Sequence, residues 1–278
     1  MNREFALLDT IMMPLTKRLE DKQSLVESEI EPDAEVIITV AYDNNGYGDC
    51  LIAAWGFSCL VKRPQKTILF DTGADGRILL SNMARLGISV DEIDAIVLSH
   101  IHGNHTGGLD RFLKCNSRVT VYVPLSFPDQ IKQHIKSYGA NLLEVHKPGE
   151  LFAGVFTTGE LGDGIREQSL LVDTCKGLVL ITGCAHPGVL NIAKRAKEIT
   201  KDKIYMMVGG FHLAGAFSSQ INYIAETLSR LGVEKVAPCH CTGNGAKRLF
   251  SNYFGNSYIE CGVGKEIVVG GRDGVRLC

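Results

Sequence analysis

From residue 34 onward, short runs of apolar and β-branched residues alternate with segments whose apolar residues recur every three or four positions. The runs predict buried strands, and the wider spacing predicts amphipathic helices. Strands are expected at 36–40, 57–61, 67–70, 94–98, 119–123, 141–145, 169–173, 178–182, 204–208, 235–237, 258–261 and 266–269. Helices are expected at 76–86, just after 108, at 127–138, after 188 through 199, around 219–231 and through 254. Polar residues predict a loop at 42–46, and glycines predict hairpins and loops at 151–164.

Residues 1–33 have a different pattern. Apolar residues recur there at helical spacing, which predicts a helix with one apolar face; they are Phe5, Leu8, Met12, Leu15 and Leu19. The sequence Glu31-Pro32-Asp33 marks the break after this helix. The helix either packs on its own domain or forms a homodimer contact, and the pattern leaves both open. We expect a helical extension at 1–33 and one domain at 34–278, because no proline- or serine-rich linker interrupts the latter.

The stretch SHIHGNHTGG at 99–108 carries three histidines within six positions: His100, His102 and His105. Three imidazoles this close cannot all lie in an apolar core, because each has a polar nitrogen that needs a partner. Imidazole is the commonest protein ligand for zinc and similar ions. The stretch therefore predicts a metal site.

A strand end, a histidine and a helix start follow one another three more times. The predicted strands 178–182, 204–208 and 235–237 each run into small residues and a histidine, which are His186, His212 and His240. Ligands in α/β folds gather beyond the carboxyl ends of the strands, so these histidines could converge with the first three. The other two of the eight histidines, His134 and His146, are expected on the surface.

Composition narrows the function classes. The chain has 278 residues, 45% hydrophobic and 22% charged, as in soluble globular proteins. A net charge of -2 argues against nucleic acid as a partner. No apolar run approaches the roughly 20 residues of a membrane span, and residues 1–20 lack the apolar core of a signal peptide. With nine scattered cysteines, we expect a cytoplasmic protein with mostly free thiols.

The helix starts after His186 and His240 favour an anionic substrate. A helix N-terminus presents free N–H groups and attracts anions. The residues at these starts are small or polar: Gly188, Thr242, Gly243 and Asn244. Beside a divalent metal they favour a phosphorylated or diphosphate small molecule. Turn geometry alone is the alternative explanation for the glycines.

The histidine stretch resembles the motif of the metallo-β-lactamase fold, His-x-His-x-Asp-His-x-Gly-Gly after a strand. Asp71 at an earlier strand end, His186 and His240 match the family's other motif positions in order. More narrowly, five segments resemble the subgroup of dihydropterin–ribofuranosylaminobenzene phosphate synthases. They are FDTG (70–73), EQSL (167–170), ITGCAHPG (181–188), GGFHL (209–213) and PCHCTG (238–243). Enzymes of that subgroup join a pterin methyl diphosphate to an arylamine.

The resemblance implies an α/β (α+β) fold, a four-layer αββα sandwich with a metal site at one edge of its two sheets. His100, His102 and His186 would form a first site with an open position. The implied cofactor is one or two divalent metal ions, zinc first, with iron and manganese as alternatives. Zinc in such a site binds water and lowers its pKa towards about 7.

The resemblance also implies a second site, held by His105 and His240 together with residue 104. Asp71 would be a nearby carboxylate that orients ligands. Residue 104 is Asn104, where the family usually has Asp. An amide oxygen is neutral, is a poorer ligand than a carboxylate and cannot act as a general base. The second site should therefore be weakened or empty.

The family's bridging Asp before the last histidine has no clear match, and the corresponding strand end offers His212. His212 could bind metal, bind substrate, transfer protons or simply pack in its loop. Cys184, Cys239 and Cys241 flank expected ligands. Alternation along an extended segment would point His240 away from Cys239 and Cys241, which favours packing for both.

Two functions from different classes follow from these patterns. The first is a metal-dependent hydrolase or transferase for a phosphorylated or diphosphate small molecule, pterin-related if the subgroup resemblance extends to the substrate. Its candidate catalytic residues are Asn104, His212 and Asp71. The second is a non-catalytic metal- or ligand-binding protein with a degraded second site, for which Asn104 argues. Hydrolysis of β-lactams is less favoured, because a fold does not fix a function.

Overall fold

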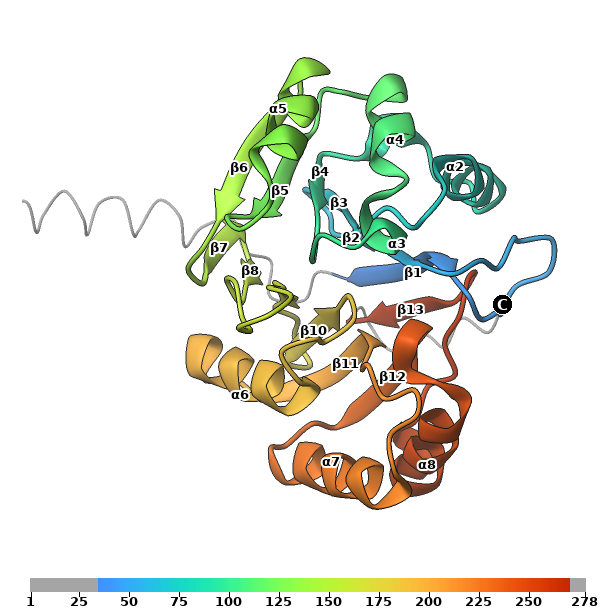
Figure 1. Cartoon of the computed structure of the whole chain (residues 1–278). Helices are drawn as coiled ribbons and strands as arrows, with labels where there is room; N and C mark the ends of the chain where they lie inside the picture. Colours follow the sequence, from blue (N-terminus) through green and yellow to red (C-terminus); the bar gives the residue numbers. More distant parts are fainter. Residues whose placement is uncertain (1–34, 271–278) are drawn as a thin grey trace, which may run out of the picture. The chain divides into compact units, whose positions relative to one another are not determined.

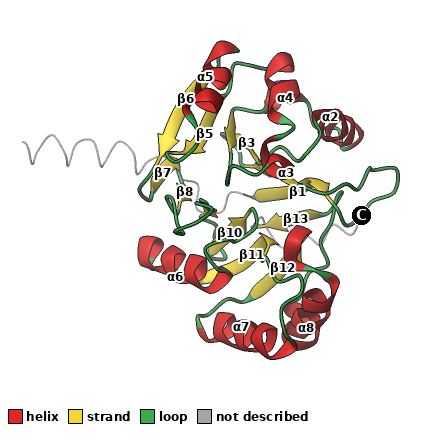
Figure 2. Cartoon of the chain, viewed as in Figure 1, coloured by secondary structure: helices red, strands yellow, loops and turns green. Residues whose placement is uncertain are grey.

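A computed structural model describes residues 35–270, which form two β-sheets with helices outside them (Figure 1). The first sheet has seven strands in the order β13-β1-β2-β3-β4-β5-β6, and the second has six in the order β12-β11-β10-β9-β8-β7. Figure 2 shows the strands gathered in the middle and the helices on both outer sides. The expected αββα sandwich is confirmed. The expected N-terminal helix at 1–33 lies outside the described residues.

The first sheet is antiparallel at one side and parallel at the other. β13, β1, β2 and β3 pair antiparallel, whereas β3, β4, β5 and β6 run parallel. Its strands are β1 (Val36–Asp43), β2 (Phe57–Lys62), β3 (Thr67–Phe70), β4 (Ala95–Val97), β5 (Thr120–Pro124), β6 (Asn141–Val145) and β13 (Glu266–Val269). Its helices are α2 (Gly76–Arg85), α3 (Gly103–Thr106), α4 (Leu109–Cys115) and α5 (Asp129–Ser137), with a 3-10 turn at Val90–Glu92.

The second sheet has a parallel half that carries three of the predicted histidine loops. β10, β11 and β12 run parallel, and β7, β8 and β9 continue the sheet antiparallel. The strands are β7 (Gly149–Phe152), β8 (Val155–Thr157), β9 (Leu170–Val172), β10 (Leu178–Thr182), β11 (Ile204–Gly210) and β12 (Lys235–Cys239). The helices are α6 (Val189–Thr200), α7 (Ser218–Arg230) and α8 (Asn244–Phe254), with 3-10 turns at His240–Thr242 and Gly255–Ser257.

Alternation along the strands builds the layers. In β3, Ile68 and Phe70 face the core between the sheets, while Leu69 faces the outer helices. In β10, Val179 and Ile181 face the same inner core, while Leu180 packs on the second set of helices. A strand buried on both faces reads as a continuous apolar run because successive side chains point to opposite sides. In the first sheet β3 and β4 are parallel, and in the second β10, β11 and β12 are parallel. Their carboxyl ends lie at one edge of the sandwich, where a site can form.

Most predicted elements agree with the structure to within two residues at each end, and two do not. The polar loop expected at 42–46 begins later, because β1 continues through Asp43, whose buried carboxylate accepts hydrogen bonds from the backbone of Asn45 and His240. The strand expected at 258–261 is absent from the described structure. This segment crosses between sheets: Ile259 N–H donates to Val236 in β12, whereas Val263 N–H donates to Asn45 beside β1. Because the segment hydrogen-bonds first to one sheet and then to the other, it does not form a strand in either.

Within residues 35–270, no helix combines the length and the apolar character that crossing a bilayer requires.

The glycines that end the histidine stretch allow it to lie against β3. A Cβ added at Gly108 would stand 2.1 Å from the carbonyl oxygen of Thr72. Thr72 in turn donates two hydrogen bonds to the carbonyl oxygen of His105, from its N–H (2.7 Å) and its hydroxyl (2.9 Å). The close backbone approach at Gly108 therefore fixes the helix that carries His105 against the end of β3.

We expect Gly108→Ala to lower the free energy of unfolding by about 1–3 kcal/mol, the usual cost of forcing an extra carbon into a packed site. Urea unfolding of the metal-free protein, followed by circular dichroism, measures this loss. Gly103→Ala is the matched control, because a Cβ there meets nothing within 4 Å. It should change the free energy of unfolding by less than about 0.5 kcal/mol. Equal stability of the two variants would contradict the close packing at Gly108.

Candidate metal centre

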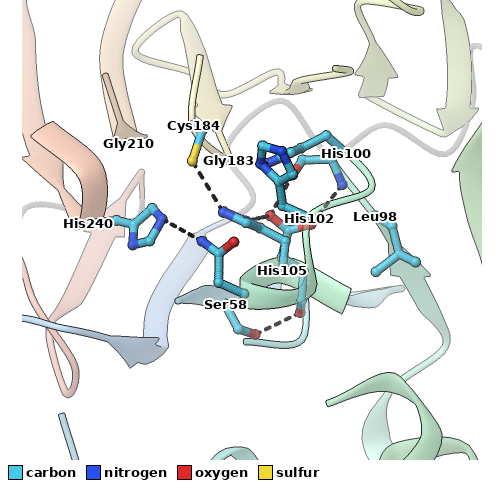
Figure 3. A network of polar contacts seen from close by, with 12 residues as sticks. Ser58, Leu98, His100, His102, His105, Gly183, Cys184, Gly210 and His240 are labelled. Atoms are coloured by element: carbon cyan, nitrogen blue, oxygen red, sulfur yellow. Dashed lines mark hydrogen bonds and ion pairs between the residues drawn. The ribbon is translucent and has the colours of Figure 1, made fainter. Parts of the chain in front are cut away.

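Six histidines from four strand ends converge at this edge of the sandwich. Each imidazole ring has another histidine ring within 5.0 Å, centroid to centroid. The six are His100, His102, His105, His186, His212 and His240, the set that the strand-end pattern indicated. Figure 3 shows His105 turned toward Cys184, with His100, His102 and His240 around them. His134 and His146 are exposed and belong to other surfaces, as expected.

The first group consists of His100, His102 and His186. Nδ1 of His100 bonds to the hydroxyl of Ser99 at 2.8 Å, which leaves its Nε2 directed at Nδ1 of His102, 3.1 Å away. Nε2 of His186 is buried and has no hydrogen-bond partner. A buried polar atom without a partner is costly and calls for an explanation such as an ion. A metal ion held by these three nitrogens would satisfy it.

The second group consists of His105 and His240. Nδ1 of His105 bonds to Asp71 at 2.7 Å and Nδ1 of His240 bonds to Oδ1 of Asn44 at 2.9 Å. Each Nε2 is thereby turned inward. His105 Nε2 lies 3.2 Å from Cys184 Sγ, and His240 Nε2 lies 3.1 Å from the side-chain nitrogen of Asn104. Hydrogen bonds to the outer ring nitrogen are the usual way in which proteins orient metal-binding histidines.

Burial keeps four of these imidazoles neutral. Desolvation lowers the pKa of His105 to about 3, of His186 to about 4 and of His240 to about 3. Desolvation also lowers the pKa of His100, helped by the neighbouring histidines. The neutral imidazole is the form that binds metal ions. The donor set therefore fits a divalent metal at neutral pH.

Asp71 stands behind the second group, where the sequence placed an orienting carboxylate. It is fully buried with a left-handed backbone (φ 58°), and it accepts hydrogen bonds from Ser99 N–H and Ser99 Oγ, both at 2.7 Å. Burial raises the pKa of Asp71 to about 8, against the effect of those bonds. A nearby dication would lower this pKa again. Asp71 contacts His105 and not the open space, so its place is that of a positioning residue.

Glu167 is a site residue to which sequence reasoning gave no role. Its Oε1 accepts the N–H groups of Gly183, Cys184 and Ala185 at 2.9–3.1 Å, and its Oε2 accepts that of His186 at 2.9 Å. Burial raises the pKa of Glu167 to about 7, while the backbone bonds lower it. The carboxylate thus fixes the loop that carries Cys184 and His186. EQSL was part of the family resemblance, but no spacing rule connects a carboxylate to N–H groups 16 to 19 residues later.

His212 and two thiols form a third group beside the first. His212 is exposed with a left-handed backbone (φ 53°), and its ring lies 4.4 Å from that of His186. Its hydrogen bond with Cys241 raises the pKa of His212. Contact with Cys184, then with His212, lowers the pKa of the Cys241 thiol to about 6. The same contact with Cys241, and burial, raise the pKa of Cys184, so Cys184 keeps its proton in the metal-free protein.

Cys239 and Cys241 are both buried, as packing requires, but their side chains point to different places. Cys239 lies in the core between the sheets. Cys241 turns toward the site, where its Sγ donates to the carbonyl oxygen of Cys184 at 3.5 Å. The alternation rule fails because His240 begins a 3-10 turn with a φ of 48°, so the segment is not extended.

The expected anion-binding residues do not gather at one hollow. A hollow of about 530 Å³ adjoins the histidines and is lined by the 161–165 loop, His186, Pro187 and Asn191; Gly188 lies next to it, exposed, at the start of α6. Asn244 lines a second hollow of about 540 Å³ at the start of α8, whose lining contains none of the six histidines. Thr242 is buried, and its hydroxyl already bonds to Cys239 and Phe211. Its side chain is therefore closed to a substrate.

The sequence pattern described as the metallo-beta-lactamase superfamily matches residues 56–240, which is most of the described chain. The chain belongs to the metallo-β-lactamase superfamily. Members of this fold bind divalent metal ions, in agreement with the clustered His and Cys ligand atoms described above.

Several similar proteins align with this chain over nearly their whole length. The 7,8-dihydropterin-6-methyl-4-(beta-D-ribofuranosyl)-aminobenzene-5'-phosphate synthase of Methanocaldococcus jannaschii is 30% identical over 280 aligned positions, covering 83% of this chain and 95% of the relative. Among solved structures, Tm1679, a metal-dependent hydrolase of the β-lactamase superfamily, is 28% identical. It aligns with a TM-score of 0.71 over 85% of this chain and 100% of that one. The short form of human tRNase Z, 14% identical with a TM-score of 0.57, over 83% and 98% respectively, shares the fold alone.

We expect Glu167→Gln to weaken both the fold and the metal centre. The amide of Gln would place an N–H donor opposite a backbone N–H, so one buried donor would lose its acceptor at a cost of about 1–3 kcal/mol. Metal affinity should fall about 10–100-fold, as for other residues that orient ligands. Competition with a chelating dye and urea unfolding measure the two effects.

Glu150→Gln is the control for this substitution. Glu150 is exposed and accepts one backbone N–H, from Gly154. Its variant should bind metal like the wild type. Unchanged metal affinity in Glu167→Gln would mean that the 183–186 loop holds its shape without the carboxylate.

Proposed function

We propose that this protein is a metal-dependent enzyme that acts on a phosphorylated or diphosphate small molecule, with a pterin-related compound as the favoured substrate. One observation carries the proposal. The buried Nε2 of His186 has no partner, and this ring clusters with His100, His105 and His240, whose imidazoles burial keeps neutral. Their outer nitrogens are already bonded to Ser99, Asp71 and Asn44. Such a cluster is built for a cation and not for packing.

In this proposal His100 Nε2, His102 Nδ1 and His186 Nε2 would hold the first metal ion. His105 Nε2 and His240 Nε2, with Asn104 beside them, would hold the second. Zinc suits this donor set best, and iron or manganese are alternatives. When bound, a divalent ion supplies a Lewis acid that polarises a phosphoryl group or activates water.

The surroundings of the centre support an anionic, planar substrate. The hollow beside His186 lies at the start of α6, since Pro187 and Asn191 line it, and helix starts attract phosphate groups. Trp55 is 57% exposed, and its ring centroid lies 4.7 Å from that of His240. An exposed indole at the rim offers a flat face on which a heterocycle can stack. The similar synthase of M. jannaschii carries a dihydropterin and an aminobenzene phosphate in its name.

Two reactions fit such a substrate, and they differ in the attacking atom. In hydrolysis, water attacks phosphorus, a P–O bond breaks and a phosphate is released. In group transfer, an arylamine nitrogen attacks the methylene carbon of a pterin methyl diphosphate, the C–O bond breaks, and diphosphate and one proton leave. We assign the role of proton acceptor in either case to His212, which is exposed and whose ring lies 4.4 Å from that of His186.

A second candidate function, non-catalytic binding of a metal or ligand, rests on Asn104. Its side-chain nitrogen lies 3.1 Å from His240 Nε2, where the family motif usually supplies a carboxylate. If the oxygen and nitrogen of the amide exchanged places, Oδ1 would lie near His240 Nε2 instead. A neutral oxygen is a weak metal ligand, however, and it cannot act as a base. Replacing Asn104 with Asp is therefore the substitution that distinguishes catalysis from non-catalytic binding.

We expect His186→Ala to remove about one equivalent of metal and to lower kcat/KM at least about 100-fold, since metal activation contributes several kcal/mol to catalysis. Metal analysis and a screen of phosphomonoesters, phosphodiesters and pterin diphosphates, with and without an arylamine, measure both quantities. His134→Ala is the matched control, an exposed histidine far from the centre, and should behave like the wild type. Metal uptake below about half an equivalent in wild-type protein after reconstitution would refute the proposal.

We expect Asn104→Asp to bind the second metal ion about 10–100-fold more tightly and to turn over substrate faster, because it adds a charged ligand. Binding of a pterin can be followed separately through the emission of Trp55, the single tryptophan of the chain. The affinity of Asn104→Asp for the pterin should differ little from that of the wild type. If a pterin quenches Trp55 emission but neither form turns over any substrate of the screen, binding becomes the better function.

A further inference from the structure

The end of β11 supplies no side chain that could join the two histidine groups. β11 ends in Gly209 and Gly210. A Cβ added at Gly210 would stand 2.4 Å from the carbonyl oxygen of Gly183 and 2.7 Å from Cys241 Sγ. Both distances are far below ordinary contact, so any acid at this position would displace the neighbouring loops. A ligand shared by metal ions at the two histidine groups would therefore have to come from another part of the chain.

Cys184 occupies the space between the groups. Its Sγ clusters with the ring nitrogens of His100 and His186, and again with those of His105 and His240, all ligand atoms in each cluster lying within 4.8 Å of one another. The contact with His105 Nε2 is 3.2 Å (Figure 3). Within residues 35–270, Cys184 is the residue that both clusters share. The sulfur thus lies within reach of both metal positions.

The backbone around Cys184 is fixed by several contacts. Its N–H donates to Glu167 at 2.9 Å, its carbonyl oxygen accepts from Cys241 Sγ, and Ala185 after it has a left-handed backbone (φ 63°). The side chain is 3% exposed. A buried thiol held this firmly keeps its place whether or not it binds a metal, as a preorganised ligand does.

We propose that Cys184 bridges the two metal ions through its thiolate, in place of the carboxylate of other family members. Coordination removes the thiol proton, and the bridge adds the negative charge that Asn104 does not supply. This inference rests on the proposed function, because it requires metal ions at both histidine groups. A bridging sulfur favours zinc, iron or cobalt over magnesium, since thiolate is a soft ligand.

Titration of the full-length, metal-free protein with Co²⁺ tests the bridge, with metal content and the sulfur-to-cobalt charge-transfer absorption in the near ultraviolet as readouts. The wild type should bind two equivalents, and the absorption should grow with both, because one sulfur contacts each ion. Cys184→Ser should lose the absorption and bind at least one ion about 10–100-fold more weakly. Cys184→Asp should again bind two ions, without the absorption.

Cys241→Ser is the matched control, because Cys241 clusters with His212 and Cys184 but with neither histidine pair. It should keep the absorption. Wild-type protein that binds cobalt without this absorption would overturn the bridge and leave the proposed function standing. Absorption that grows with only one of the two equivalents, or that is lost in Cys241→Ser and kept in Cys184→Ser, would also overturn it. Failure of the wild type to bind cobalt, zinc or iron would refute both proposals.

Discussion

Two adjacent side chains, Glu167 and Gln168, tie the two halves of the metal centre together. Glu167 accepts the N–H groups of residues 183–186 in the second sheet. Gln168 donates to the first sheet, through its N–H to Ser99 and through its side chain to Leu98, both at 2.9 Å. These are the residues that lead into the histidine stretch. Most of these bonds are buried, where an unmade bond is most costly, so the position of His186 relative to His100, His102 and His105 depends on this pair.

The fold and the cluster of histidines could be predicted because both follow from local patterns. Runs such as the one that forms β10 specify strands, and a histidine directly after a parallel strand lies at the sheet edge whatever the rest of the chain does. Glu167 and Asn44 could not be assigned roles in this way. Glu167 binds backbone groups, which carry no sequence signal, and Asn44 contacts His240 across 196 positions. The direction of the Cys241 side chain could not be predicted, because the left-handed backbone of His240 breaks the alternation.

The departures from the family pattern belong together in space. Gly210 leaves β11 without a side chain, Cys241 Sγ lies 2.7 Å from the point where a Cβ of that residue would stand, and Cys184 lies between the histidine groups. Asn104 faces the same interior beside His240. Carboxylates are thus exchanged for sulfur and an amide around one volume, which changes the character of the donors from hard to soft while the imidazoles stay. A substitution at one of these positions therefore has to be judged with the other three.

Each histidine group draws on both sheets, since His100, His102 and His105 follow β4, whereas His186 and His240 follow β10 and β12. An ion bound by such a group closes a loop through the whole fold and binds the folded chain alone, so it stabilises that chain in proportion to the logarithm of its free concentration. Resistance to heat and to proteolysis then rises and falls with the supply of the metal. If such ions are bound, a shortage of the metal would lower the amount of folded protein as well as the occupancy of the site.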